Sequence, residues 1–253
     1  MAILQIRDLS KYFIGLAALR CVEFDVLESE IIGLIGPNGA GKTTLFNIIS
    51  GFYPPTSGKV VFCGQDITGL KAHKIAKMGI GRTFQATNLF MNMTVLENVL
   101  TGFHLRHKLG LWKAFLHTRS SRDEDRVNKK QAMEILEFLG LSMIKDELAG
   151  NLPHGHQRIL GICIALATNP KLLLLDEPAT GMHPEEMLAL VSLIRKLRDR
   201  GITIICVDHH MEAVMRLCDR LVVLSFGEKI SEGLPEEVRK DKGVIEAYLG
   251  VEL

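Results

Sequence analysis

The stretch GPNGAGKTT occupies residues 36–44 and follows directly on the apolar run EIIGLIG at residues 30–36. It fits the pattern G-x-x-x-x-G-K-[S/T] at every fixed position. The short apolar run before it is typical of a strand that is covered on both faces. Residues 43–49 continue as a helix, which Gly51 ends. The stretch therefore predicts a strand, a tight glycine-rich loop and a helix, in that order.

This loop has the composition of a phosphate cradle. Glycines let backbone N–H groups curl around an anion without side-chain clashes, and the helix behind the loop turns its positive dipole end toward that anion. Lys42 can reach the β- and γ-phosphates of a nucleotide, and the hydroxyl of Thr43 can bind Mg²⁺. We therefore predict a nucleotide-binding site with these members: Gly36, Pro37, Asn38, Gly39, Ala40, Gly41, Lys42, Thr43 and Thr44.

A second acidic signal lies at residues 172–178, LLLLDEP. Four leucines predict a buried strand, so Asp176 and Glu177 stand at its carboxyl end, where open α/β sheets bind their ligands. Asp176 would hold Mg²⁺ directly or through water, and Glu177 could act as the general base that polarises an attacking water. The alternative is that both acids only cap a following helix.

Composition limits the class of protein. The 253 residues are 47% hydrophobic and 23% charged, with a formal net charge of +1. This balance is ordinary for a globular protein and provides no long-range attraction to nucleic acid. The amino-terminal residues do not form a signal peptide, and no apolar stretch is long enough to span a membrane, so we expect a cytosolic chain. We expect the cysteines to be small buried side chains without a zinc site; they are Cys21, Cys63, Cys163, Cys206 and Cys218.

Together, these motifs resemble the ATP-binding subunit of an ATP-binding cassette (ABC) transporter, and the resemblance covers nearly the whole chain. It implies ATP and Mg²⁺ as cofactors. It also implies an α/β fold, a P-loop NTPase with a RecA-like core, an antiparallel β subdomain and a helical ABC insert. The chain would be one nucleotide-binding domain, with residues 1–93 and 157–253 as the core and antiparallel β part and residues 94–156 as the helical subdomain.

The resemblance assigns roles to residues outside the two motifs. Phe13, in KYFIGLAAL, matches the aromatic residue that stacks on adenine, with Tyr12 as the alternative. Gln85, in GRTFQATNLF, matches the glutamine that touches both the metal site and the transmembrane partner. We count Gln85 among both the catalytic and the metal-binding residues.

A histidine at the end of another apolar run, residues 202–207, completes the implied catalytic set with Glu177 and Gln85. His209, in ICVDHHM, matches the family's switch histidine, which can hydrogen-bond the γ-phosphate and orient the attacking water. Its neighbour His210 is the alternative. We prefer His209 because the family pattern is an apolar run, an acid and a histidine, and Asp208 occupies the acid position.

The insert carries further signals. Residues 94–97 (TVLE) and 121–124 (SRDE) both match a capping box and predict two helix starts. Trp112 and Phe115 form either an apolar contact face for a partner or part of the insert's own core. With TFQ before it, an insert of this kind most resembles that of the ATPase subunits of branched-chain amino acid importers.

The segment LPHGH, residues 152–156, stands where the family has the signature Leu-Ser-Gly-Gly-Gln at a helix start. Pro153 lacks both a hydroxyl and an N–H donor, whereas Gly155 still permits close backbone approach. The resemblance implies that Gly155 contacts the nucleotide held by a second ATPase subunit, and we expect this contact to work in altered form. His183 replaces the usual Asp or Asn in the turn after the acids. Both departures favour an unequal pair of subunits, although drift in one lineage would explain them too.

We therefore expect an ATPase that dimerises on MgATP and drives a separate membrane permease, with import of branched-chain amino acids or a similar solute. Its partners would be integral membrane permease subunits, a second ATPase subunit as a homo- or heterodimer, and a solute-binding protein, but no nucleic acid. The chain would lie in the cytoplasm, peripheral on the inner face of the membrane. The alternatives are a soluble ABC ATPase without a transport role and a slow-turnover, nucleotide-gated binding subunit. At the end of the chain, residues 220–233 predict a hairpin and Pro235 begins a last helix that ends near Leu249.

Overall fold

The computed structural model describes residues 1–83, 89–103, 119–208 and 210–249. The chain forms two compact units. The first combines Met1–Arg82 with Lys171–Leu253, and the second is Thr83–Pro170. The second unit extends beyond the helical subdomain of residues 94–156 at both ends.

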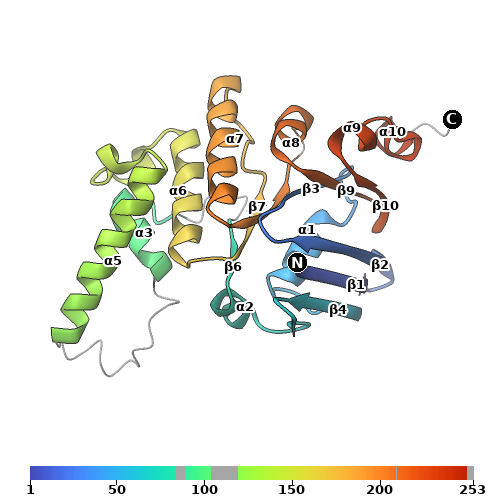
Figure 1. The fold of residues 1–253 in the computed structure, drawn as a ribbon, viewed down its shortest axis with the longest axis horizontal. Coiled ribbons are helices and arrows are strands. Elements are labelled where there is room, and N and C mark those ends of the chain that lie inside the picture. Colours follow the sequence, from blue (N-terminus) through green and yellow to red (C-terminus); the bar gives the residue numbers. More distant parts are fainter. Residues whose placement is uncertain (84–88, 104–118, 209, 250–253) are drawn as a thin grey trace. The chain divides into compact units, whose positions relative to one another are not determined.

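The first unit contains two sheets (Figure 1). One is antiparallel, with the strand order β2-β1-β4-β5. Its strands are β1 (Ala2–Phe13), β2 (Leu16–Leu27), β4 (Ser57–Phe62) and β5 (Gln65–Asp66). The two strands at the beginning of the chain, β1 and β2, thus belong to the antiparallel β part that the resemblance implies.

The other sheet has the order β10-β9-β3-β8-β7-β6, and all its neighbours are parallel except the β9–β10 pair. Helices of the same unit join some of these strands, while the chain between β6 and β7 forms the second unit. The sheet and its helices are β3 (Ile31–Ile35), α1 (Lys42–Ile49), α2 (Ala72–Met78), β6 (Ile80–Arg82), β7 (Leu172–Asp176), α7 (Pro184–Asp199), β8 (Thr203–Val207), α8 (Met211–Leu217), β9 (Arg220–Ser225), β10 (Glu228–Gly233), α9 (Pro235–Val238) and α10 (Lys242–Leu249). This is the α/β P-loop architecture predicted from the sequence.

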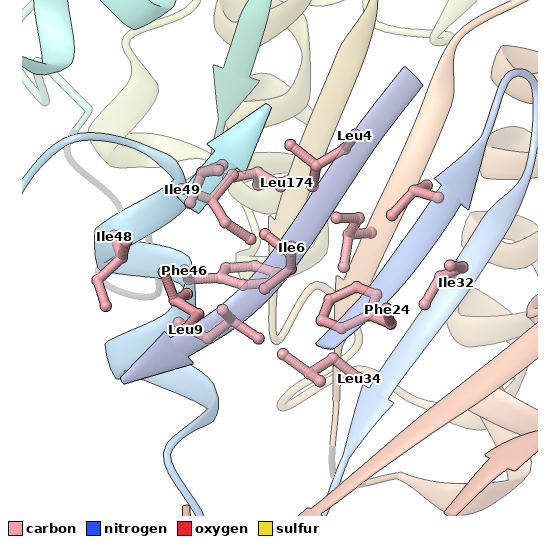
Figure 2. Close-up of a cluster of buried hydrophobic side chains, with 14 of the residues drawn as sticks. Leu4, Ile6, Leu9, Phe24, Ile32, Leu34, Phe46, Ile48, Ile49 and Leu174 are labelled. Carbon is pink, nitrogen blue, oxygen red and sulfur yellow. The ribbon is translucent and has the colours of Figure 1, made fainter. Parts of the chain in front are cut away.

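The core of this unit surrounds α1 (Figure 2). Phe46 of α1 is fully buried, together with Ile6 and Leu9 from β1 of the antiparallel sheet. Leu34 of β3 and Leu174 of β7 join the same cluster from the parallel sheet. Truncating a buried phenylalanine of this kind to alanine typically costs roughly 3–5 kcal/mol. The helix that follows the glycine loop is therefore fixed by apolar packing against strands of both sheets.

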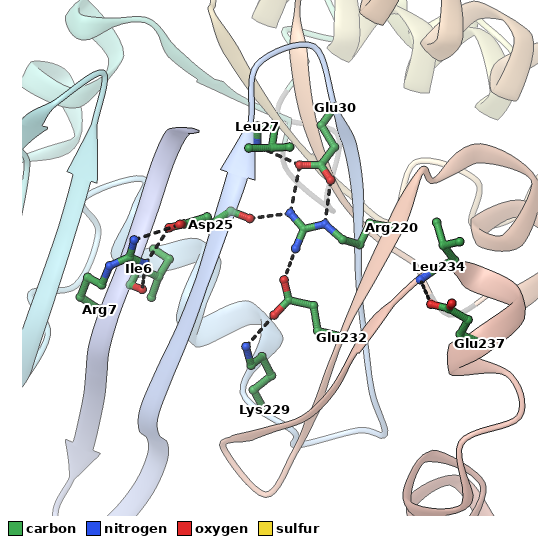
Figure 3. A network of polar contacts seen from close by, with 10 residues as sticks. All are labelled: Ile6, Arg7, Asp25, Leu27, Glu30, Arg220, Lys229, Glu232, Leu234 and Glu237. Atoms are coloured by element: carbon green, nitrogen blue, oxygen red, sulfur yellow. Dashed lines mark hydrogen bonds and ion pairs between the residues drawn. The ribbon is translucent and has the colours of Figure 1, made fainter. Parts of the chain in front are cut away.

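A polar network also joins the two sheets (Figure 3). Arg220, at the start of β9, donates to Glu30 at 2.8 and 3.0 Å and to the backbone carbonyl of Asp25 at 2.6 Å. It also pairs with Glu232 of β10. On the far side, the carboxylate of Asp25 accepts from Arg7 of β1 at 2.9 Å. One arginine thus connects β2 of the antiparallel sheet to β9 and β10.

The second unit contains α3 (Val95–Gly102), α5 (Arg119–Phe138) and α6 (His154–Ala167), with short 3-10 turns at Ser142–Ile144 and Ala149–Asn151. The capping box at Thr94 is confirmed: its Oγ1 accepts from the Glu97 N–H, and the Glu97 carboxylate accepts from the Thr94 N–H. The second box is wrong as a helix start, because Ser121 lies inside α5. Trp112 and Phe115 lie outside the described residues.

Two further expectations need correction. Cys163, Cys206 and Cys218 are buried as predicted, but Cys21 and Cys63 are exposed. Both exposed cysteines belong to the antiparallel sheet or its turns and have positive φ angles of 45° and 48°, which interrupt the regular alternation of buried and exposed positions. The predicted last helix is two helices, α9 and α10, because the side chain of Asp241 accepts from the N–H groups of Gly243 and Val244 and starts a new one.

Candidate nucleotide-binding site

The strand order brings three loops to one edge of the parallel sheet. β3 pairs with β8, and β8 pairs with β7, all in parallel. The segments that leave the carboxyl ends of these strands begin at Gly36, Glu177 and Asp208. Because carboxyl ends of parallel strands meet at the same edge, the glycine loop and the acids predicted from sequence are brought together there.

The loop between β3 and α1 can be built only with glycine at two of its positions. A Cβ added at Gly36, where φ is +149°, would lie 2.0 Å from the carbonyl oxygen of Leu224. A Cβ added at Gly41, where φ is +103°, would lie 2.5 Å from the carbonyl oxygen of Ala18. The N–H of Gly227, in the β9–β10 turn, also donates to the carbonyl of Ala40 at 3.1 Å. Neighbouring backbone thus fixes the curled loop.

Lys42 is folded into this loop. Its Nζ donates to the carbonyl oxygens of Gly36 at 2.7 Å and Pro37 at 2.9 Å. Burial lowers the pKa of Lys42, while the nearby carboxylate of Glu177 acts in the opposite direction. Thr43 follows in the first turn of α1 and is exposed. A preformed loop, a cation inside it and an exposed hydroxyl at the helix start fit a Mg²⁺-bound triphosphate.

Asp176 is the last residue of β7, and its side chain is only 7% exposed. Its Oδ2 accepts from Nη2 of Arg82, at the end of β6, at 3.0 Å. The same guanidinium donates to Oδ1 of Asn47 at 2.7 Å and to Oγ of Ser50 at 2.9 Å, and both belong to α1 or its C-cap. The predicted metal carboxylate is therefore paired with a cation of the chain itself.

Glu177 has a left-handed backbone conformation, with φ of 49°. Such a conformation is strained for a residue with a side chain, and active sites are among the places where such residues cluster. Its N–H donates to the carbonyl of Val207 at 2.7 Å, so the neighbouring strand β8 holds it in place. Its carboxylate accepts from the hydroxyl of Thr180 at 3.4 Å.

Asp208 organises the end of β8. It is buried, and its Oδ2 accepts from the N–H of Ala179 at 3.1 Å. Its Oδ1 accepts from the N–H of His210 at 2.9 Å and lies 3.0 Å from Nδ1 of that histidine. The acid that the sequence pattern placed before the switch histidine thus links the loops after β7 and β8. His209 and Gln85, which we predicted as catalytic residues, lie outside the described residues.

The predicted base-stacking residue, Phe13, ends β1 and is 37% exposed. Its ring makes an edge-to-face contact with Tyr53, with centroids 5.6 Å apart, and Nζ of Lys11 lies 4.9 Å from its centroid. Tyr53 follows α1 and is itself partly exposed. An exposed aromatic pair beside a lysine can hold a flat, electron-rich ring system.

In the second unit, α6 begins within the altered signature. Pro153 is the N-cap and provides no side-chain hydrogen bond. Gly155 is buried in the first turn, while His154 and His156 are exposed. Gln157 ties this turn to the segment before it, because its side-chain amide donates to the carbonyl of Leu152 at 3.0 Å.

Two residues that contribute to this site were not predicted from the sequence. Arg82 stands in GIGRTF, and no local pattern indicates that it reaches a carboxylate 94 residues further along the chain. Tyr53 stands in GFYPP, and an aromatic residue just after the loop's helix is the one signal that could have drawn attention to it.

The glycine loop between β3 and α1, the two acids at the end of β7 and this strand order define a P-loop nucleoside triphosphatase. The family model described as ABC transporter matches residues 19–180, and the model described as branched-chain amino acid ATP-binding cassette transporter matches residues 228–253. The first of these models alone covers more than half of the chain. The chain therefore belongs to the ABC transporter family, as an ATP-binding subunit, and is an ATPase.

Relatives and solved structures agree with this family assignment. The chain is 40% identical to the high-affinity branched-chain amino acid transport ATP-binding protein BraF of Pseudomonas aeruginosa, over 98% of both chains. It is 42% identical to LivG of Escherichia coli, a protein of the same description, again over 98% of both chains. A nucleotide-free ATP-binding cassette from an ABC transporter superposes with a TM-score of 0.88, at 35% identity, over 99% of this chain and 100% of that one. A dimeric bacterial ABC transporter cassette superposes with a TM-score of 0.76, at 27% identity, over 92% of this chain and 98% of that one.

The structure contains no candidate membrane span among the residues it describes, since none of the helices there is both long and apolar enough.

Proposed function

We propose that this chain binds ATP with Mg²⁺ on the loop at residues 36–44, hydrolyses it, and thereby powers a separate membrane permease that imports branched-chain amino acids or a similar solute. The observation that carries the proposal is a preformed glycine loop that holds Lys42, at the same edge of the sheet as Asp176 and Glu177. The solute is inferred from the names of relatives that match this chain along nearly its full length.

Each residue at the sheet edge has a proposed role. Thr43 and Asp176 would hold Mg²⁺, which neutralises phosphate oxygens when it is bound. Glu177 would accept a proton from the attacking water, because it stands at the end of β7 on a strained backbone beside the loop. Phe13 would stack on the base. Gln85 and His209 keep their predicted roles in contacting the metal site and the γ-phosphate.

A second ATPase subunit would complete the site. Gly155 and the start of α6 would face the nucleotide that the second subunit holds, as the family signature does. A related cassette has been solved as a dimer, which supports such a pair. The pair would act on integral membrane permease subunits together with a solute-binding protein. It would lie on the cytoplasmic face of the membrane, held there by the permease and without a nucleic-acid partner.

The replacement of Glu177 by glutamine tests the proposal. Removing the general base should lower the steady-state hydrolysis rate by at least about 100-fold, while ATP affinity is retained. A complex that cannot hydrolyse its nucleotide should also accumulate as a MgATP-dependent dimer in size-exclusion chromatography. Glu185→Gln is the matched control, because Glu185 is an exposed acid in the first turn of α7. Unchanged hydrolysis by the Glu177→Gln protein would contradict the assigned base.

Reconstitution tests the transport role. Hydrolysis by the wild-type chain should rise when candidate permease subunits and a loaded solute-binding protein are present in vesicles. If hydrolysis is fast without any permease and none stimulates it, a soluble ABC ATPase is the better description. If hydrolysis remains slow even with permeases but Pro153→Ser accelerates it, the altered signature makes the chain a slow, nucleotide-gated subunit.

A further inference from the structure

Arg82 occupies a socket that is built around its charge. Nη1 donates to Asn47 at 2.7 Å and to Ser50 at 2.9 Å, while Nη2 donates to Asp176 at 3.0 Å. The guanidinium carbon lies 5.7 Å from the ring centroid of Phe46 and 5.6 Å from that of Phe52. Aromatic faces attract a cation, and amide, hydroxyl and carboxylate oxygens accept its protons. Every one of these neighbours therefore favours a positively charged, planar group.

The pair is shielded from water. The side chains of Arg82 and Asp176 are 8% and 7% exposed. Breaking a buried ion pair by removing one partner is strongly destabilising, because the other charge is left without compensation. Removing Arg82 would take away the positive charge whose Nη2 lies 3.0 Å from the carboxylate of Asp176. The socket thus supplies the positive charge that Asp176 needs.

The same contacts fix the two proposed metal ligands, Thr43 and Asp176, relative to each other. Thr43 lies in the first turn of α1, and Asn47 lies one turn further along the same helix. Arg82 connects Asn47 to Asp176, and hence ties the helix that carries Thr43 to the end of β7. Lys42, the cation of the glycine loop, is bonded to the loop carbonyls of Gly36 and Pro37.

We propose that Arg82 is a positioning residue for the metal site: it neutralises Asp176 while no Mg²⁺ is bound and keeps that carboxylate fixed to α1. This inference rests on the proposed function, in which Asp176 belongs to the Mg²⁺ site. Between turnovers, the carboxylate would stay oriented toward the site instead of turning away. The next Mg²⁺-nucleotide would then meet a formed site.

A double-mutant cycle on the nucleotide-free protein in EDTA tests the pairing, with the midpoint of thermal unfolding as the readout. Arg82→Met should lower the midpoint by roughly 10 °C. The same substitution in an Asp176→Asn background should lower it by less than half as much, because the neutral amide needs no counter-charge. The matched control is the cycle of Arg198→Met with Asp219→Asn, a more exposed pair at 2.9 Å, where coupling should be small. Additive losses in the Arg82–Asp176 cycle would overturn the inference.

A lysine variant covers the case in which Arg82→Met does not fold. Arg82→Lys keeps the charge but loses the planar fork that reaches α1 and Asp176 together. Its midpoint should lie closer to that of the wild type than to that of Arg82→Met, or, if the Met protein is not recovered, the Lys protein alone should fold. A Lys protein as unstable as the Met protein, or equally unrecoverable, would show that charge is not what the socket requires and would overturn the proposal.

Measurements with added nucleotide distinguish a failure of this inference from a failure of the proposed function. In the wild type, ADP with Mg²⁺ should raise the midpoint more than ADP with EDTA does. In the Arg82→Met protein, or in the equally neutral Arg82→Gln where the Met protein is not recovered, this Mg²⁺-dependent gain should be larger, since the metal replaces the missing positive charge. If the wild type shows no Mg²⁺-dependent gain, the proposed metal site fails, whatever the cycle gives. If the gain is present but equal in wild type and variant, the role of Arg82 fails and the metal site stands.

Discussion

At the scale of single residues, the site contains charges that the fold must accommodate before any nucleotide arrives. Lys42 is partly buried and bonded to two loop carbonyls. Burial lowers its pKa, although the carboxylate of Glu177 favours the charged form. A lysine whose pKa is lowered in the folded state makes that state less stable while the ammonium is charged. Function, rather than stability, therefore accounts for a lysine at this place.

This cost should be visible in the pH dependence of stability. Between the lowered pKa of folded Lys42 and its ordinary value of 10.5, the unfolded chain binds more protons than the folded one, so the free energy of unfolding rises with pH. The wild type should therefore gain stability relative to Lys42→Met as pH is raised toward 10.5. The gain is limited to about 1.4 kcal/mol for each unit by which the pKa is lowered. Urea unfolding of both proteins measures it, and a constant difference would speak against a perturbed Lys42.

The residues that could be predicted are those whose chemistry is carried by local spacing. The glycine loop and the acids after β7 are short patterns with a fixed order, so the sequence reveals both. Arg82 could not be found in this way, because its meaning depends on Asp176, which lies 94 residues further along the chain. Asp208 was seen only as the neighbour of a histidine, whereas it also holds the N–H of Ala179 from another loop.

At the scale of elements, α3 and α6 show how glycines with opposite roles occur in one unit. A Cβ on Gly102, in α3, would lie 2.4 Å from the carbonyl oxygen of Ile164 and 2.7 Å from Cβ of Ala167, both in α6. The two helices touch at this glycine. Gly161, in the middle of α6, has no neighbour within 4 Å of an added Cβ.

Alanine at these two glycines should therefore have opposite effects. Gly161→Ala should stabilise the second unit by about 1 kcal/mol, because alanine is the better helix former and fills open space. Gly102→Ala should destabilise it by roughly 1–3 kcal/mol, because the added methyl group forces α3 and α6 apart. Denaturant unfolding of each variant gives the two free energies, and each serves as the control for the other. Two changes of the same sign would mean that helix propensity alone, or packing alone, governs both sites.

Element boundaries could be predicted where local chemistry decides them. Thr94 and Glu97 form their capping box within one turn, and the helix begins there. The same pattern at Ser121 lies inside α5, where no helix begins. A sequence match to the capping box is therefore weak evidence for a helix start. The break between α9 and α10 depends on Asp241, which also accepts from Ser231 of β10 at 2.6 Å. Asp is a preferred N-cap residue, so this helix start has a local signal, whereas the contact with Ser231 arises only in the tertiary structure.

At the scale of the whole molecule, the order of strands decides which segments meet, and only part of it follows from sequence. Placing the acids at a strand end was enough to expect them at the sheet edge. The sequence did not show that β3 lies between β8 and β9. That order brings β9 and the β9–β10 turn beside the loop. There the Gly227 N–H donates to the carbonyl of Ala40, and the carbonyl of Leu224 leaves no room for a side chain at Gly36.

The buried cysteines allow each unit to be followed separately. Cys163 lies in the second unit, whereas Cys206 and Cys218 lie in the first. Burial raises the pKa of all three thiols, so they react with a thiol reagent only when the surrounding structure opens. Cys21 and Cys63 are exposed and should be modified at once, which makes them internal controls.

Nucleotide should slow the opening of one unit more than that of the other. The loop at residues 36–44 belongs entirely to the first unit, so a ligand bound there stabilises that unit directly. At a nucleotide concentration of about 100 times the dissociation constant, modification of Cys206 and Cys218 should slow by roughly 100-fold. Cys163 should slow clearly less, since local opening of the second unit leaves the loop intact. Mass spectrometry of digested samples resolves the rates. Equal protection of all three thiols would show that the two units open only together, as one cooperative structure.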